Sequence, residues 1–437
     1  MVDSSFNIWW GLVGLIPLLV YMVLVLRDMD PLPATIICVV IGAVINAKSL
    51  AAVGTDLSKA MGSFLGLVGL IIMLGRGLGE ILSETKVAHT LVYKIMYGIG
   101  VNSQRKAAMG IILASMVIVG LLGTMAGGVA IIAPIVNPIA AAVGLTPAVV
   151  AVLYQSAGEE ALTLGPFTPP VVTLIGLTKL DYGTMILTAA IPIAVVTMLA
   201  AWTMVWRIQR DTADKEPYDR TIAAGSDTFT PTDVSRRATN IFILLFTALI
   251  VYGIFIKAST PYVISVMLIL AFVVGFAGRM KFDDICRGVV RGMAGNVGLF
   301  LLFILLELLI NYVEQAGGFK ALTYMLMPLI KLGGKAAVVI AGGAIGAFGI
   351  SGAVVAELMT LHKMFSGLVS QYGVSMIAWA VALIVATRVT NFIIPGSNMV
   401  AMMGFAQSKN LKSMIRNGWA VALAQTALLI AYALLFA

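Results

Sequence analysis

The chain has 437 residues, of which 60% are hydrophobic and 11% are charged, and its mean hydropathy is +1.03. Soluble domains carry about 25% charged residues, so this composition excludes a soluble globular protein and indicates an integral membrane protein. The net charge of +8 does not indicate a nucleic-acid partner, because most basic residues lie in short loops between apolar segments, where they orient a membrane protein.

Apolar segments of about 18 to 25 residues recur along the chain and predict membrane-spanning helices rather than the shorter alternating strands of a barrel. The predicted spans of the first half are 8–26, 33–47, 60–82, 147–178 with a break near Gly165, and 183–206. Those of the second half are 240–257, 261–278, 290–313, 375–408 with a break near Pro395, and 415–436. The fold class is therefore an all-α integral membrane protein, with about five spans in each half.

Each half also contains a stretch that predicts a re-entrant helical hairpin. The first covers 107–143 with its tip near Gly123–Gly128, and the second covers 336–370 with its tip near Gly349–Gly352. Glycine readily adopts the backbone conformations that a sharp turn requires. The alternative is a full span with a glycine kink, since glycine is common in ordinary transmembrane helices. A further stretch, 86–100, predicts either an amphipathic helix in the membrane interface or an ordinary loop helix.

Residues 208–237 form the one long polar stretch and separate a first transmembrane repeat, 1–207, from a second, 238–437. Basic residues in and beside this linker predict that it is cytoplasmic. Five spans on each side then place both termini outside the cell. Because each half crosses the membrane an odd number of times, the two repeats are predicted to be inverted relative to each other.

Helix-breaking residues occur in the same order in the two repeats. Gly158–Pro170 follows the first hairpin and Thr387–Asn398 follows the second, so that Pro166 and Pro395 take corresponding places. Broken backbone at membrane depth is tolerated only where it is buried in protein or lines a cavity. Paired breaks in two repeats point to the substrate site of a transporter, near the middle of the membrane.

The tips Gly123-Thr124-Met125-Ala126-Gly127 and Ile350-Ser351-Gly352-Ala353, paired with the breaks, resemble the ion transporter superfamily. Within it, the length, the central linker and the overall pattern are most similar to the gluconate:proton symporter family of bacterial permeases. The resemblance implies a homodimer in the bacterial inner membrane. It also implies a scaffold portion and a transport portion that moves like an elevator, and symport of organic anions with protons or sodium.

The breaks have chemistry of their own that suits an anion. A helix that begins in mid-membrane exposes free N–H groups and the positive end of its dipole, and hydroxyl and amide groups nearby can donate to carboxylates. For any single Ser or Thr, the alternative is a hydroxyl bonded within its own helix or to a neighbouring helix. The predicted substrate-binding residues are Thr124, Ala126, Gly127, Gly165, Thr168, Ser351, Gly352, Thr387, Arg388, Asn391, Ser397 and Asn398.

Three charged residues lie in these segments. Arg388 falls in an apolar run, where a charge costs at least about 2.5 to 3.5 kcal/mol and needs a partner. A substrate carboxylate and a structural ion pair with Glu159 or Glu160 are equally good partners, and Glu159 occupies the place in the first repeat that corresponds to Arg388 in the second. Glu159 and Glu160 are the predicted ion-coupling residues, because a poorly solvated carboxylate takes up a proton readily. Sodium held by backbone carbonyls is the alternative.

The prediction is a secondary active symporter of small organic anions, such as sugar acids or short carboxylates, with a proton or sodium as coupling ion and no cofactor or metal. A cation-coupled antiporter, or a carrier of amino acids or neutral metabolites, is the alternative. An enzyme is not expected, because His89 and His362 are the only histidines and lack metal-binding spacing. A channel fits poorly, because inverted repeats with midplane breaks suit alternating access.

Overall fold

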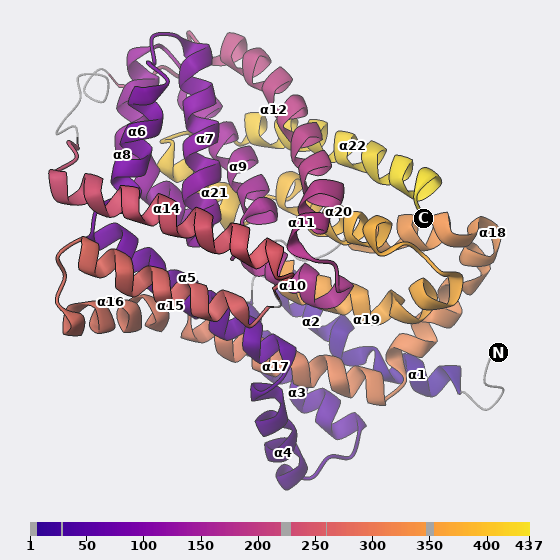
Figure 1. The fold of residues 1–437 in the computed structure, drawn as a ribbon. Coiled ribbons are helices and arrows are strands. Elements are labelled where there is room, and N and C mark those ends of the chain that lie inside the picture. The colour runs from indigo at the N-terminus through magenta and orange to yellow at the C-terminus, as the bar shows by residue number, and fades with distance from the viewer. Residues whose placement is uncertain (1–6, 28, 220–228, 259, 347–353) are drawn as a thin grey trace. The chain divides into compact units, whose positions relative to one another are not determined.

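The described part of the chain is helical throughout (Figure 1). A computed structural model describes residues 7–27, 29–219, 229–258, 260–346 and 354–437, and every regular element within these ranges is a helix. Ten helical segments in this part of the chain are at least 18 residues long and apolar enough to cross a membrane. The predicted class, an all-α integral membrane protein, is confirmed.

The helices follow the chain in the order of the predicted segments. Those of the first half are α1 (Ile8–Gly14), α2 (Ile16–Leu26), α3 (Pro31–Ile45), α4 (Leu50–Met61), α5 (Phe64–Glu84), α6 (Val87–Gly98), α7 (Gln104–Leu122), α8 (Met125–Ala142), α9 (Pro147–Leu164), α10 (Pro169–Thr178), α11 (Tyr182–Met185), the π-helical turn η1 (Ile186–Ala190) and α12 (Ile191–Thr212). Those of the second half are α14 (Asp233–Phe255), α15 (Tyr262–Ala277), α16 (Phe282–Ala294), α17 (Val297–Gln315), α18 (Gly318–Gly346), α19 (Val354–Tyr372), α20 (Met376–Ile393), α21 (Ser397–Phe405) and α22 (Leu411–Leu435).

Each predicted span coincides with a helix, but the predictions missed α4, α16 and the first part of α18. In α16 the buried residues Ile285, Val289 and Gly292 recur at helical spacing, which is typical of an amphipathic helix. The predicted span 290–313 therefore begins too early, because α16 runs to Ala294 and α17 begins at Val297. The helices α3 and α15 have 15 and 16 residues and are shorter than the other spans.

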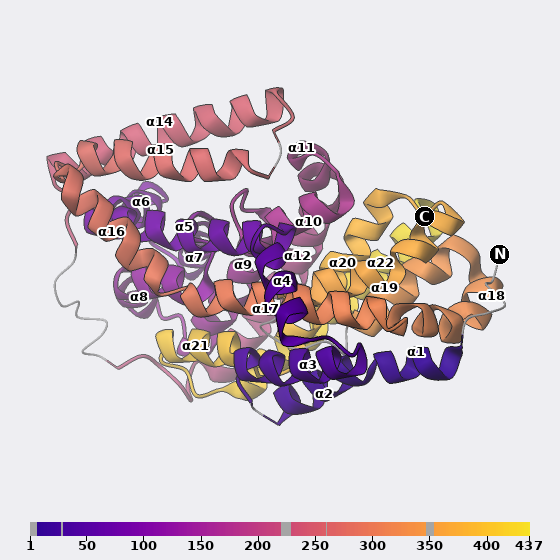
Figure 2. The same ribbon diagram turned by 90° about the horizontal axis from the view of Figure 1, so that it is seen from below.

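Packing divides the chain into two compact units, and each unit draws on both halves of the sequence. Unit 1 consists of Met1–Leu70, Asn296–Thr387 and Leu429–Ala437, and unit 2 consists of Ile71–Gly295 and Arg388–Leu428. In unit 1, α3 packs against α17, and α18 packs against α19. In unit 2, α14 and α15 run side by side, as Figure 2 shows. The predicted repeats divide the chain by sequence order instead, and both of their boundaries fall within unit 2.

The order of the helices supports a duplication. The helix α9 begins at Pro147 and α20 begins at Met376, and each has 18 residues. The separation of these two starts equals that of Pro166 and Pro395 in the sequence. The short helices that follow, α10 and α21, begin at Pro169 and Ser397, with almost the same separation. A break therefore follows corresponding helices, α9 and α20, in the two halves, as predicted. The inversion of one repeat relative to the other stays a prediction.

The first predicted hairpin is present as α7 and α8, which pack against each other. The chain turns between them at Gly123, which has φ +67° in the left-handed region that favours glycine. With 19 and 18 residues, each arm is about 27 Å or more in length at 1.5 Å per residue. The arms are long enough to cross most of a membrane, so how deeply the hairpin enters it stays a prediction.

The second predicted hairpin is described only in its arms. The helix α18 is interrupted at Gly334, which has φ +57° and ψ −139°, close to the predicted start of the hairpin at 336. The arm after this interruption leads toward the tip, and α19 returns from it as far as Tyr372. The tip, with the predicted binding residues Ser351 and Gly352, lies outside the described residues.

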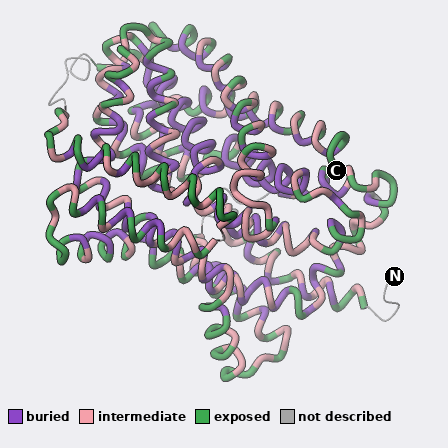
Figure 3. Tube along the Cα trace, in the orientation of Figure 1, coloured by how far each residue is buried: buried purple, intermediate pink, exposed green. Residues whose placement is uncertain are grey.

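The helix α9 is the centre of unit 2. Every residue from Pro147 to Thr163 is buried, and α7, α12 and α21 pack against this helix. Figure 3 shows buried backbone running through this region. A helix that is buried on every side meets protein on every side, so each polar side chain that α9 carries must find its partners within the bundle.

Candidate functional site

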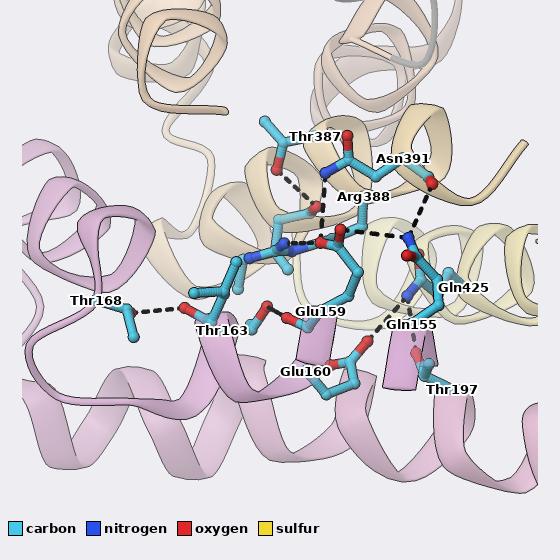
Figure 4. Close-up of polar contacts among 12 residues, drawn as sticks. Gln155, Glu159, Glu160, Thr163, Thr168, Thr197, Thr387, Arg388, Asn391 and Gln425 are labelled. Carbon is cyan, nitrogen blue, oxygen red and sulfur yellow. Dashed lines mark hydrogen bonds and ion pairs between the residues drawn. The ribbon is translucent and has the colours of Figure 1, made fainter. Parts of the chain in front are cut away.

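A fully buried ion pair joins the two halves of the sequence within unit 2. Glu159 on α9 and Arg388 on α20 are 0% and 1% exposed at their side chains, and Nη1 of Arg388 contacts Oε2 of Glu159 (Figure 4). The separation of the two residues in the sequence is the same as that of the starts of α9 and α20. Of the two partners predicted for Arg388, the structure therefore contains the ion pair with Glu159.

Two amide side chains complete the surroundings of this pair. Nδ2 of Asn391 lies 3.3 Å from Oε2 of Glu159. Nε2 of Gln155 lies 3.2 Å from the carbonyl oxygen of Asn391 and 3.5 Å from Oε1 of Glu159. The Nε group of Arg388 is buried without a hydrogen-bond partner among the described residues. The Nε–H donor of Arg388 is thus unused, although it lies beside the Glu159 carboxylate.

Glu160 faces a different set of neighbours, although it follows Glu159 directly. Its Oε1 atom lies 3.4 Å from Nε2 of Gln425 on α22, and that amide nitrogen also lies 2.7 Å from Oγ1 of Thr197 on α12. No ion pair involves Glu160 within the described residues. The two adjacent glutamates therefore differ in their direct contacts, because the Glu159 carboxylate contacts a cation and the side chain that donates to Glu160 is a neutral amide.

The first break lies against the tip of the first hairpin. A Cβ atom added at Gly123 would lie 3.5 Å from Cδ of Pro169, and one added at Gly165 would lie 2.6 Å from the carbonyl oxygen of Gly120. The hydroxyl of Thr168 donates to the carbonyl oxygens of Leu162 (2.6 Å) and Gly165 (2.8 Å). Thr168 was predicted to contact the substrate, but its hydroxyl caps the C-terminal end of α9 instead.

The start of α10, predicted to bind an anion, offers fewer free N–H groups than expected. Its first two residues are Pro169 and Pro170, which have no N–H group. The N–H of Val172 already bonds to the carbonyl oxygen of Thr168. Of the first four residues of α10, only Val171 can offer a free N–H group to a ligand.

The remaining predicted substrate-binding residues differ in their burial and bonding. The hydroxyl of Thr387 donates to the carbonyl oxygens of Leu383 and Ile384 in its own helix. This is the alternative given above for any single Ser or Thr. Thr124 and Asn398 are half-buried, whereas Ala126, Gly127 and Ser397 are exposed. The structure thus brings together Glu159, Arg388 and Asn391, with Glu160 beside them, and it brings the first hairpin tip to Gly165 and Thr168.

Sequence reasoning missed five polar residues that surround the two glutamates. Gln155 and Ser156 lie one helical turn before Glu159 and Glu160, and this i, i+4 spacing places them on the same faces of α9. That spacing was a usable signal. The other missed residues, which lie far away in the sequence and which no spacing connects to α9, are Thr197, Asn417 and Gln425.

Comparison with known proteins supports a membrane transporter. The model of the Na+/H+ antiporter family matches residues 8–158. The structure of MtrF from Neisseria gonorrhoeae, one of a class of antimetabolite efflux pumps, has a TM-score of 0.62 and 14% identity, with 94% of this chain and 96% of that chain covered. This chain therefore shares the fold of MtrF.

Two further comparisons add little. The YdaH transporter of Alcanivorax borkumensis has a TM-score of 0.49 and 17% identity, with 88% of this chain and 89% of that chain covered. A search of curated proteins found no match. None of these findings supports the gluconate:proton symporter family in particular. The matches are to transporters, which favours transport over catalysis.

Proposed function

We propose that this protein is a cation-coupled secondary transporter of small solutes that bear a carboxylate group. The observation that carries the proposal is the buried pair of Glu159 and Arg388, which joins the two repeats beside their helix breaks. Embedded ionisable residues are costly and mark solute pathways in membrane proteins more often than they serve packing. The fold shared with MtrF, from a class of antimetabolite efflux pumps, agrees with a small organic solute.

The guanidinium group of Arg388 fits a carboxylate ligand. Arginine presents its N–H donors in a planar fork that matches the two oxygens of a carboxylate. The Glu159 side chain already shows that a carboxylate is accommodated here, and Nε of Arg388 remains available. In the proposed mechanism the carboxylate of the solute takes the place of Glu159 on Arg388. Asn391 and Gln155 then supply neutral hydrogen-bonding groups at the same place.

This exchange of partners couples the solute to a cation. Once the solute holds Arg388, Glu159 is a fully buried carboxylate without a positive partner, a situation that costs several kcal/mol. A proton or a sodium ion on Glu159 removes that cost. The solute therefore binds more tightly when the cation is present, and by linkage the cation binds more tightly when the solute is present.

The composition of unit 2 suggests which part of the chain moves. Unit 2 includes the hairpin α7–α8, the break between α9 and α10, the break between α20 and α21, and the ion pair. An elevator movement of the kind implied by the resemblance would carry these elements together as the transport portion. The resemblance implies that the hairpins of both repeats belong to the transport portion, but the described arms of the second hairpin belong to unit 1.

Replacing Arg388 with lysine tests the proposed carboxylate site. Lysine keeps the positive charge but loses the planar fork, and a hydrogen bond to a charged group is worth about 1.5 to 3 kcal/mol. We therefore expect the KM for counterflow of a labelled carboxylate in proteoliposomes to rise by about tenfold to a hundredfold. The matched control is Arg416→Lys, at an exposed pair with Asp211 in the same unit. Equal KM values for Arg388→Lys and the control would remove the proposed role of Arg388.

Exchange of sodium for protons is a second candidate function, because the matching family model describes Na+/H+ antiporters. In this case Glu159 and Glu160 serve the transported ions and no organic solute is needed. Proteoliposomes with an imposed pH gradient and no carboxylate distinguish the two. Collapse of the gradient on adding NaCl, but not on adding choline chloride, is the expected result for an exchanger. A gradient that responds only after a carboxylate is added supports the solute transporter.

A further inference from the structure

A second polar cluster surrounds Glu160, next to the Glu159–Arg388 pair on α9. It consists of Ser156 and Glu160 on α9, Thr197 on α12, and Asn417 and Gln425 on α22, and each of these residues is at most 1% exposed. Nδ2 of Asn417 lies 3.1 Å from Oγ of Ser156, and Gln425 bridges Glu160 and Thr197. We call these five residues the α9–α12–α22 cluster. All of them belong to unit 2.

Three oxygen atoms of the cluster are buried without a partner in the described part of the chain. Oε2 of Glu160, Oδ1 of Asn417 and Oε1 of Gln425 are buried without a hydrogen-bond partner among the described residues. The amide nitrogens of Asn417 and Gln425 are already engaged with Ser156, Thr197 and Glu160. A buried acceptor without a donor costs free energy, and a carboxylate that is buried without an ion pair among the described residues costs more. The cluster therefore favours a positively charged ligand.

The charge of the cluster selects the class of ligand. Glu160 is its only ionisable group, and the nearest other charges, Glu159 and Arg388, neutralise each other. One positive charge therefore balances the cluster, whereas a divalent ion leaves it with an excess that burial makes costly. Carboxylate, amide and hydroxyl oxygens are ligands for hard cations. An anion is disfavoured, because the Glu160 carboxylate would repel it.

We infer that the α9–α12–α22 cluster is a binding site for one monovalent cation, either a sodium ion held by its oxygens or a proton on Glu160. The amide groups of Asn417 and Gln425 turn their oxygens toward the ion by rotation of their side chains. The site is distinct from the Glu159–Arg388 pair and does not depend on the proposed carboxylate transport. It gives Glu160 a cation that binds without any solute, whereas Glu159 takes up a cation only when a solute holds Arg388.

Binding of radioactive sodium to the purified protein in detergent tests this site without any organic solute. We expect saturable binding that is absent in Glu160→Gln, a substitution of nearly the same shape. Gln425→Leu and Thr197→Val are expected to weaken the apparent affinity by about tenfold to a hundredfold, the range seen when groups around a metal ion are removed. The matched control is Thr203→Val on the same helix, whose exposed hydroxyl bonds only to the carbonyl oxygen of Ala200.

A measurement of proton uptake identifies the cation if sodium does not bind. In a weakly buffered solution shifted from alkaline to mildly acidic pH, the native protein should take up one more proton than Glu160→Gln does. The inference is overturned if Glu160→Gln matches Thr203→Val in both sodium binding and proton uptake. Circular dichroism of each variant shows whether it has folded, and the thermal unfolding midpoint with and without NaCl repeats the binding test. Failure of carboxylate counterflow leaves this result unaffected.

Discussion

Replacing Arg388 with glutamine is expected to lower the free energy of unfolding by about 3 to 5 kcal/mol, the usual cost of removing one partner from a buried ion pair. The substitution leaves the Glu159 carboxylate fully buried with no positive group beside it. Thermal and denaturant unfolding of the purified protein in detergent measure this loss. Arg416→Lys, at an exposed pair with Asp211, should change stability by less than about 1 kcal/mol.

The double variant Glu159→Gln/Arg388→Gln separates a structural role from a transport role. With both charges removed, no buried charge remains, so most of the lost stability should return. Carboxylate uptake should stay absent, because the guanidinium fork that binds the solute is gone. A double variant that recovers both stability and uptake would show that the pair serves only to hold α9 against α20.

Replacing Gly418 with alanine is expected to be the most damaging single-methyl change in unit 2. A Cβ atom at this position of α22 would collide with the carbonyl oxygen of Phe392 on α20 and would lie 2.7 Å from its carbonyl carbon. Backbone atoms cannot rotate away as a flexible side chain can, so one helix has to shift. The cost should reach the upper end of the range of about 1 to 3 kcal/mol for an overpacked core.

The consequences of the Gly418 substitution extend to both polar clusters. Asn417 precedes Gly418, and Asn391 precedes Phe392, so a shift between α20 and α22 displaces a member of each cluster. We expect a lower unfolding midpoint together with weaker sodium binding. The control is Gly404→Ala in α21, where an added Cβ atom meets nothing within 4 Å. Equal unfolding midpoints for the two variants would show that α22 is not held closely against α20.

The membrane class, the spans and the breaks were all predictable from the sequence, because each depends on local composition. An apolar segment of span length has few alternatives to a transmembrane helix, and a run such as Gly165-Pro166-Phe167-Thr168-Pro169 cannot continue one. The helices α4 and α16 were missed because amphipathic segments between two spans resemble loops when only mean hydropathy is considered. The turn at Gly123 was predicted from glycines that permit the left-handed backbone found there.

What the sequence determined by itself was therefore that Arg388 needs a partner and that Glu159 occupies the corresponding place in the other repeat. Only the tertiary structure decided that these two meet, that Glu160 turns to Gln425 and Thr197 instead, and that the hydroxyls of Thr168 and Thr387 bond to their own backbone. The physical reason is that burial makes every polar group find a partner. Which partner it finds depends on helices that lie far apart in the sequence and touch only in the folded bundle.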